Sequence, residues 1–580
     1  MLALGTLVAM TFSRVPFMRL AFLGGLVCAS AVSAHDVGKG NVLVLDGAPV
    51  PDDVDAFGFS GENITVISHL PLADLGGKDP VSDRNNRGKV NGSDLWGWTD
   101  PMTDREYALF GRSDALSFVD VTDATNPAFL GMLPTHSLNN LYRDIKTYQN
   151  YAYVVADVSD HGMQVFDLTR LRGVTEQPED FWEADTHYAE FGGAHNIVIN
   201  PESGFALAVG SDTYSGGMHF IDLQDPLNPK PLGGVRSLGY THDAQAITYR
   251  GPDVDYVGRE IVLGYTVDSL SIVDASNPAE PSVLSNTGYD GRRYAHQGWV
   301  TEDHRFALMN DELDELQLKQ NARTHIWNIE DLDEPVYLGY YEADSNFTDH
   351  NLYIKDGLAY EANYLGGLRV LDLSNIENGQ LSEVAWLDTQ PQIDSPYFNG
   401  LWSVYPYFES GAIIMSDMTK GLIVAEVEHD AIKLVGDFDG DRLLGKNDLM
   451  LLLQAVQNGS QDLQFDINND GQVTGVDGRY WVRDIYESVA GDADLNGTFD
   501  SKDLVQVFQA NEYEDEEALN SDWSDGDWNG DREFTSTDLV VAFQDRGYER
   551  AAQAVPEPSQ FTGGLTAASL LVLLRCRRYF

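Results

Sequence analysis

The stretch Leu270-Ser-Ile-Val-Asp-Ala-Ser-Asn-Pro278 decides the fold, because versions of it recur along the chain. Alternating apolar residues that end on an acidic residue before an Asn-Pro turn predict a β-strand followed by a tight turn. The strand-like run occurs seven times, at residues 116–120, 164–167, 218–222, 270–274, 324–328, 368–372 and 422–426. The chain therefore contains an internal repeat.

A polar pair that leads into another predicted strand marks the start of each unit. Six steps from the first copy to the last cover 306 residues, both for this pair and for the strand-like run, so one unit has about 51 residues. The pairs are Ser93-Asp94, Arg143-Asp144, His195-Asn196, His242-Asp243, His296-Gln297, His350-Asn351 and Asn399-Gly400.

Repeats of this length, with short apolar strands and no helical periodicity, are typical of four-stranded propeller blades. We therefore predict an all-β, seven-bladed β-propeller over residues 35–430. A closed ring leaves no free sheet edge between its first and last blades. The strand-like segment 63–70, upstream of the first full unit, is expected to supply a strand to the last blade.

Several longer motifs resemble a known family. The Leu270 strand is similar to the LVIVD repeat. Four further motifs resemble those of choice-of-anchor B proteins: Asp94-Leu-Trp-Gly-Trp-Thr-Asp100, His161-Gly-Met-Gln-Val-Phe-Asp167, Ala194-His-Asn-Ile-Val-Ile199 and Thr241-His-Asp-Ala244. The resemblance covers about residues 64–427. It implies a surface domain attached by one of several C-terminal anchors, and it implies no particular activity.

The acidic residue that closes each strand-like run has two interpretations. It could be a ligand for an ion, or its carboxylate could accept backbone N–H bonds in the following turn. We favour the turn contact, because residues at the same place in every blade do not converge on one point.

The polar pairs form the candidate site of the propeller. First strands of blades line the central axis, so four consecutive histidines would approach one another: His195, His242, His296 and His350. Because imidazole is a common transition-metal ligand, one hypothesis is a metal or anion site at the channel mouth. Its flanking carboxylates would be Asp94, Asp144 and Asp243. The alternative, which we favour, is hydrogen bonding from each histidine to the backbone of the next blade.

From Gly436 onward the chain contains four Asp-rich loops of 12 residues, each followed by a short apolar segment. Oxygen ligands at loop positions 1, 3, 5, 7, 9 and 12 are the pattern that wraps calcium in an EF-hand loop, with position 7 giving its carbonyl. The predicted ligands are Asp437, Asp439, Asp441, Leu443 and Asp448; Asp466, Asn468, Asp470, Gln472, Thr474 and Asp477; Asp492, Asp494, Asn496, Thr498, Asp500 and Asp503; and Asp527, Asn529, Asp531, Glu533, Thr535 and Asp538.

The sixth loop position separates the four loops into two kinds. Gly471 and Gly497 occupy it in the second and third loops, whereas Arg442 and Arg532 occupy it in the first and fourth. A non-glycine residue in the left-handed conformation costs about 1 kcal/mol, so we expect weaker calcium binding in those two loops.

Aspartate at position 12, followed by Leu449, Leu504 and Leu539, resembles dockerin type I repeats, in two loop pairs at 436–487 and 491–548. We therefore predict a small α-helical, EF-hand-like (dockerin-like) calcium-binding domain after the propeller. The resemblance implies docking to a cohesin-like protein. Because the residues that enter the helices differ among the loops, a calcium-rigidified stalk remains the alternative.

Both ends of the chain carry predicted sorting signals. Arg14 and Arg19 precede an apolar run that ends Val32-Ser33-Ala34, which predicts a signal peptide over residues 1–34 and therefore export. We favour cleavage after Ala34 over lipid attachment at Cys28. The segment 555–580, from Val555-Pro-Glu-Pro-Ser559 to the terminal arginines, resembles a PEP-CTERM tail, which implies transient membrane anchoring and processing by an exosortase-type enzyme. A simple tail anchor is the alternative.

Composition excludes several classes of function. With 37 Lys and Arg against 91 Asp and Glu, the net charge of −54 argues against binding to nucleic acid or anionic membranes through charge. The two cysteines, Cys28 and Cys576, lie in the predicted sorting segments, so the mature chain would have no catalytic thiol.

The sequence contains no hydrolase elbow, zinc-protease helix or phosphate loop. We therefore predict a non-enzymatic protein of the cell surface or extracellular matrix, whose propeller binds a surface protein or polysaccharide. The competing hypothesis is a metal-dependent hydrolase or oxidoreductase that uses the four histidines.

Overall fold

The computed structural model describes most of the chain between residues 54 and 548. The described residues are 54–76, 90–174, 183–393, 395–428, 435–439, 444–468, 471–486, 488–515, 520–544 and 548. The predicted signal peptide and the predicted C-terminal sorting signal lie outside these ranges. The chain divides into two compact units, Met1–Glu426 and Val427–Phe580.

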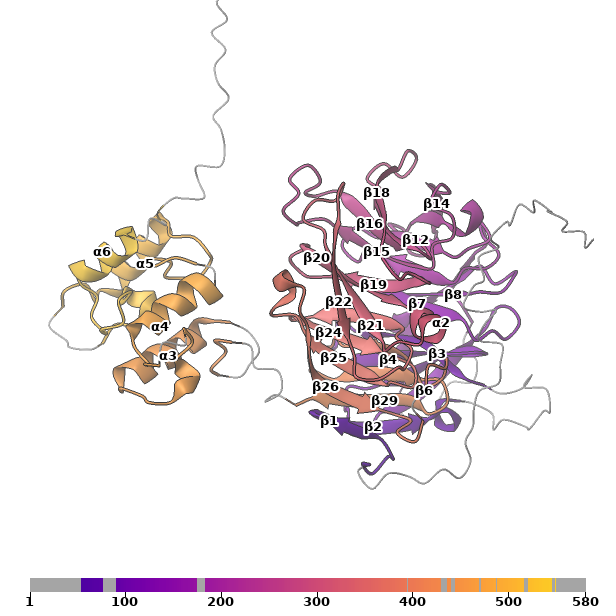
Figure 1. The fold of residues 1–580 in the computed structure, drawn as a ribbon, viewed down its shortest axis with the longest axis horizontal. Coiled ribbons are helices and arrows are strands. Elements are labelled where there is room, and N and C mark those ends of the chain that lie inside the picture. The colour runs from indigo at the N-terminus through magenta and orange to yellow at the C-terminus, as the bar shows by residue number, and fades with distance from the viewer. Residues whose placement is uncertain are drawn as a thin grey trace, which may run out of the picture. The chain divides into compact units, whose positions relative to one another are not determined.

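The first unit is a seven-bladed β-propeller, as predicted from the repeat (Figure 1). Each innermost strand packs against that of the next blade, and β27 packs against β3, so the ring closes. The innermost strands are β3 (Gly92–Thr99), β7 (Arg143–Tyr148), β11 (Asn196–Ile199), β15 (Asp243–Thr248), β19 (Ala295–Val300), β23 (Asn351–Lys355) and β27 (Leu401–Tyr405).

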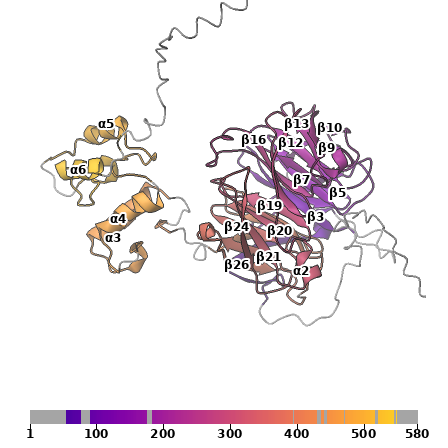
Figure 2. The same cartoon turned by 45° about the horizontal axis from the view of Figure 1, so that its top comes forward.

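The other three strands of each blade follow outward from the axis and pair antiparallel (Figure 2). The second strands are β4 (Glu106–Arg112), β8 (Tyr151–Ala156), β12 (Phe205–Val209), β16 (Glu260–Tyr265), β20 (Phe306–Asp311), β24 (Leu358–Ala362) and β28 (Ile413–Asp417). The third are β5 (Ala115–Asp120), β9 (Met163–Asp167), β13 (Met218–Asp222), β17 (Ser269–Asp274), β21 (Arg323–Asn328), β25 (Leu368–Asp372) and β29 (Gly421–Val427). The outer strands are β6 (Ala128–Pro134), β10 (Thr186–Tyr188), β14 (Lys230–Val235), β18 (Ser282–Gly288), β22 (Val336–Glu342), β26 (Ser382–Asp388) and β2 (Ile64–Pro71).

The N-terminal strands complete the last two blades. Strand β2 forms the outer edge of the sheet that contains β27, β28 and β29, which confirms the prediction for segment 63–70. A strand that the sequence did not predict, β1 (Ser60–Glu62), adds a fifth member to the preceding blade by pairing with β26. The last blade therefore combines both ends of the first unit, which ties the ring closed.

The seven strand-like runs of the repeat form the third strands, and their closing residues stabilise turns. In six blades the side-chain oxygen accepts the backbone N–H two residues later, at 2.7–3.1 Å; these residues are Asp120, Asp167, Asp222, Asp274, Asn328 and Asp372. This geometry confirms the turn interpretation. The seventh, Glu426, is exposed.

The second unit contains short helices around a core rich in tryptophan. They are α3 (Lys446–Gln457), α4 (Gly475–Tyr480), α5 (Ser501–Ala510) and α6 (Ser536–Gln544), drawn in orange and yellow in Figure 1. Two buried indoles bind the predicted calcium-loop segments: Trp481 donates to the carbonyl of Gly436 and Trp523 to that of Asp492, each at 2.7 Å. Within the described residues, no helix is both long and apolar enough to cross a membrane.

Candidate functional site

The central channel of the propeller contains two rings of polar side chains and an open cavity. The four predicted histidines meet at one mouth, with ring centroids of successive pairs 4.1–4.5 Å apart. We call His195, His242, His296 and His350 the histidine ring. The first strands bring these residues together because they are arranged around one axis and each histidine lies at or next to the first residue of its strand.

Each of three members of the histidine ring contacts the backbone of the next blade. His242 Nδ1 lies 3.1 Å from the carbonyl of His296, and His296 Nδ1 lies 3.1 Å from that of His350. His350 Nδ1 lies 2.7 Å from the carbonyl of Trp402. The favoured inter-blade interpretation is confirmed for these residues. Since a carbonyl only accepts, each Nδ1 carries a proton, and Nε2 has a lone pair wherever the ring is neutral.

Glu312, which directly follows β20, joins the histidine ring. Its Oε1 lies 3.8 Å from His296 Nε2 and 3.9 Å from His350 Nε2, and it accepts a hydrogen bond of 2.8 Å from the hydroxyl of Tyr364. Burial raises the pKa of Glu312 to about 8 and lowers the pKa of His350 to about 3. At neutral pH the imidazole of His350 is therefore neutral and lies beside a protonated or cation-paired carboxyl.

Sequence reasoning missed Glu312 because it lies outside the polar pairs and the strand-like runs that define the repeat. One signal was available: the connection 312–322 is the longest between the second and third strands of any blade, and it is acidic. A donor set of two imidazoles and one carboxylate, with ligand atoms within 4.8 Å of one another, fits a transition metal. Each Nδ1 contact to a backbone carbonyl would orient its imidazole toward such an ion.

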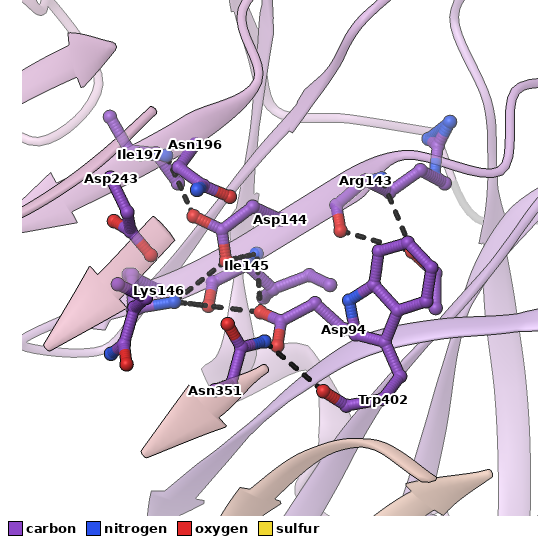
Figure 3. A network of polar contacts seen from close by, with 12 residues as sticks. Asp94, Arg143, Asp144, Ile145, Lys146, Asn196, Ile197, Asp243, Asn351 and Trp402 are labelled. Carbon is purple, nitrogen blue, oxygen red and sulfur yellow. Dashed lines mark hydrogen bonds and ion pairs between the residues drawn. The ribbon is translucent and has the colours of Figure 1, made fainter. Parts of the chain in front are cut away.

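The second ring of polar side chains lies deeper and is centred on Lys146. Its Nζ lies 2.6 Å from Asp144 Oδ1 and 3.5 Å from Asp94 Oδ2, as Figure 3 shows. Asp144 Oδ2 also accepts the N–H of Ile197 in the next blade at 2.7 Å. Burial raises the pKa of Asp94 well above its usual range and that of Asp243 to about 8.

These contacts revise the role expected for the three aspartates. They were predicted to flank the imidazoles, whereas Asp94 and Asp144 bind Lys146 and Asp243 accepts the N–H of Ala244 at 2.7 Å. Sequence reasoning did not single out Lys146, because it occurs in one blade only. Together these groups lie in the middle of the channel, since Lys146, Asp243 and Tyr353 line both the histidine end and the opposite cavity.

The opposite end of the channel opens into a cavity of about 560 Å³. Its aromatic side chains come from four blades and pack edge to face, with Trp96 and Tyr405 centroids 5.1 Å apart and those of Trp299 and Tyr353 5.0 Å apart. Lys146 Nζ lies 4.5 Å from the centre of the Trp96 ring. We call this the aromatic cavity, lined by Trp96, Trp299, Tyr353, Tyr405 and Tyr407.

The predicted calcium loops share one geometry in the second unit. The position-1 carboxylate accepts the N–H of position 6 at 2.7–2.8 Å in three loops, from Gly471, Gly497 and Arg532. The position-12 carboxylate accepts the N–H of position 9 at 2.7–3.0 Å in all four; these aspartates are Asp448, Asp477, Asp503 and Asp538. In each loop, position 12 lies in the first turn of the following helix, and its carboxylate caps the helix by accepting the N–H of the residue that precedes it.

The loop residues fit calcium where the structure describes them. Ligand atoms of Asp437, Asp439 and Asp448 lie within 4.8 Å of one another, as do those of Asp492, Asp494 and Asp503. An all-oxygen set of this kind suits calcium. Arg532 has the left-handed conformation expected at position 6, with φ of 69°. The predicted ligands Asp441, Leu443 and Asp470, and Arg442, lie outside the described residues.

No protein-family model matches this chain, and no curated protein matches it either. Among solved structures it is similar to the β-propeller domain of Cps50 (Swd1) from Myceliophteria thermophila, with 11% identity and a TM-score of 0.38 over 58% of this chain and 99% of that chain. It is also similar to the WD40 β-propeller domain of Doa1, with 10% identity and a TM-score of 0.40 over 59% and 95% of the two chains. The assignment of the propeller rests on the seven sheets of this chain.

Proposed function

We propose that this chain is an exported, non-enzymatic surface protein of the choice-of-anchor B type, whose propeller binds a ligand in the aromatic cavity. The observation that supports this function best is the cavity itself, with its volume of about 560 Å³. Sites for small ligands commonly have roughly 300–1,000 Å³, with apolar and aromatic walls and a few polar groups that fix orientation.

The lining favours the end of a polysaccharide chain as the ligand. Trp and Tyr rings give large rigid faces with a polar edge, which suit the apolar C–H faces and the hydroxyl groups of a sugar. The surrounding charged groups are of both signs, so net charge does not select the ligand; they are Glu202, Arg250, Glu302 and Lys355. A surface polysaccharide therefore matches the cavity better than a strongly charged peptide does.

Substitution of Trp299 tests this proposal. Full-length protein would be screened on an oligosaccharide array, and the best oligosaccharide would then be titrated while tryptophan fluorescence is recorded. We expect Trp299→Ala to weaken binding at least tenfold, because it removes one aromatic wall. The matched control is Trp386→Ala, since Trp386 is also half-buried but lies on the outer strand β26. No binding across the array, or equal affinity of both variants, would contradict the proposal.

The second unit is proposed to bind calcium through its four loops and to hold the propeller at the surface. Its support is the loop geometry described above together with the predicted signal peptide and sorting tail. Calcium would order the loops by joining their position-1, position-3 and position-12 carboxylates. We favour a calcium-rigidified stalk; a cohesin-like protein that bound this unit only in calcium would instead establish a docking role.

A second candidate function is metal-dependent chemistry at the histidine ring, and Glu312 is the observation that favours it. When bound, a transition metal would supply Lewis-acid or redox chemistry. His296, His350 and Glu312 would hold it, while the contacts of each Nδ1 keep the imidazoles oriented. A zinc titration of full-length protein pretreated with chelator should show one calcium-insensitive site, lost in Glu312→Gln. A titration that is unchanged by this substitution would count against the hypothesis.

A further inference from the structure

A second group of buried carboxylates lies outside the histidine ring, around the short helix α2 (Asp314–Leu318) in the connection between β20 and β21. Asp314 is 2% exposed, and Glu315 and Asp349 are each 1% exposed. Asp349 directly precedes His350, at the entry to β23 of the next blade. We call Asp314, Glu315 and Asp349 the α2 carboxylate cluster.

Six buried oxygens at this place have no hydrogen-bond partner among the described residues. They are Asn310 Oδ1, Asp314 Oδ1, Glu315 Oε2, Thr348 Oγ1, and both Oδ1 and Oδ2 of Asp349. Leaving a buried polar group without a partner costs about 1–3 kcal/mol, and more for a charged group. Such a concentration of unpaired oxygens requires a specific explanation.

These side chains face one another rather than being scattered. Glu315 Oε1 accepts the backbone N–H of Asp349 at 3.5 Å. Burial and the neighbouring charges of Asp349 and Asp314 raise the pKa of Glu315 well above its usual range. The Asn310 carboxamide lies close enough to Asp349 to lower the pKa of that carboxyl, although burial raises it overall, and Asn310 Nδ2 is itself buried outside hydrogen-bond geometry.

The nearby charged groups already have other partners. Asp311 accepts four hydrogen bonds of 2.5–3.3 Å, from the hydroxyl of Tyr289 and from three backbone N–H groups. Arg323 donates to Glu342 at 3.2 Å, and its guanidinium lies 4.1 Å from the centre of the Tyr340 ring. His325 Nε2 lies 3.9 Å from Asp314 Oδ2, and burial lowers the pKa of His325 to about 3, so this imidazole is neutral. Arg323 is the one nearby cation that lowers the pKa of Asp314, and its single positive charge leaves most of the negative charge of three buried carboxylates uncompensated.

We infer that the α2 carboxylate cluster is a divalent-cation site of the hard, oxygen-preferring class, with calcium as the best-fitting ion. The unpaired atoms are carboxylate, carboxamide and hydroxyl oxygens, which are the donors that calcium takes in its shell of six to eight ligands. Three carboxylates exceed the charge of one such ion by one, as in many calcium loops.

The ion would join two blades at the histidine ring. Its ligands come from the connection that carries Glu312 and from the segment that ends in His350. Binding would fix α2 against the entry to β23 and thereby hold Glu312 beside the imidazole of His350. The site is separate from the four loops of the second unit, and it is independent of the proposed ligand in the aromatic cavity.

Hydrogen exchange measured by mass spectrometry on the full-length protein tests the inference. After removal of metal, calcium alone would be titrated, and exchange would be followed in peptides covering residues 310–325 and 345–352. We expect calcium to slow exchange in these peptides in the wild type. Asp349→Asn should shift the calcium midpoint at least tenfold upward there and leave the peptides of the second unit unchanged. The matched control Asp344→Asn, at an exposed carboxylate close in sequence, should behave as the wild type does.

Two results would overturn the inference. The first is an absence of calcium dependence in these peptides while the second unit responds, since the carboxyls would then be neutralised by protons. The second is an Asp349→Asn titration that superimposes on the wild type. If Asp349→Asn does not fold, Glu315→Gln replaces it with the same expected shift and the same criterion, because it keeps the side-chain shape and removes one charge.

Discussion

Replacing Lys146 with methionine removes the one ammonium group that lies between Asp94 and Asp144 in the channel (Figure 3). The Lys146 side chain is 13% exposed and the two carboxylates are at most 5% exposed, so water replaces little of the lost interaction. Breaking a buried ion pair by removing one partner costs about 3–5 kcal/mol. For a unit of this size that loss lowers the melting temperature by about 4–6 °C.

The pH dependence of this loss distinguishes a buried ion pair from lost packing. Without the ammonium, the pKa values of Asp94 and Asp144 rise in the folded state. At pH values above their unfolded-state pKa values and below their folded-state pKa values, the folded state then binds more protons than the unfolded state. The stability of Lys146→Met should therefore fall as pH rises, and the variant should be closest to the wild type near pH 5.

Calorimetry of the full-length protein at fixed calcium, from pH 5 to pH 8, measures this effect on the propeller transition. Lys230→Met, at an exposed lysine of β14, is the control and should stay within about 0.5 kcal/mol of the wild type. The reasoning is refuted if Lys146→Met costs less than about 1 kcal/mol at pH 8, or if its cost does not change with pH.

Three further predictions follow from other parts of the chain. Arg532→Gly should bind calcium about fivefold more tightly in the fourth loop, measured by calorimetric titration, because glycine removes a left-handed strain of about 1 kcal/mol; equal affinity would contradict this. Asp372→Ala should cost about 1 kcal/mol in urea unfolding, because it removes the acceptor of the Ser374 N–H; a change below about 0.3 kcal/mol would show that the turn does not need it. Because burial lowers the pKa of His350 to about 3, the folded state binds fewer protons than the unfolded state below pH 6.5, and stability falls as pH drops from about 6.5 toward 3; His350→Gln should reduce this acid sensitivity, and an unchanged pH profile would argue against it.

The propeller could be predicted from the repeat because the same residue pattern forms and packs the strands of every blade. The closing aspartates were interpreted correctly because a turn contact needs only local geometry, as Asp274 and the N–H of Ser276 show. The shared last blade followed from the need to close the ring. Strand β1 was missed because three residues with two exposed members carry no apolar alternation.

Channel residues that do not belong to the repeated motifs could not be predicted from the repeat. Glu312 lies in the longest connection between a second and a third strand, outside the repeated motifs, and Lys146 stands where the other blades have uncharged residues, so the repeat marks neither of them. Their importance arises when ring closure brings different blades together at the axis. The same holds for Asp314, Glu315 and Asp349, which come from separate segments and meet only in the folded chain.

Elemental analysis of the full-length protein, purified without a histidine tag and never exposed to chelator, tests most directly whether the propeller is a binding module. The account predicts calcium and no stoichiometric zinc, copper, iron or manganese. A transition metal near one per chain that disappears in His350→Ala would contradict it, and would make His296, Glu312 and His350 an active site.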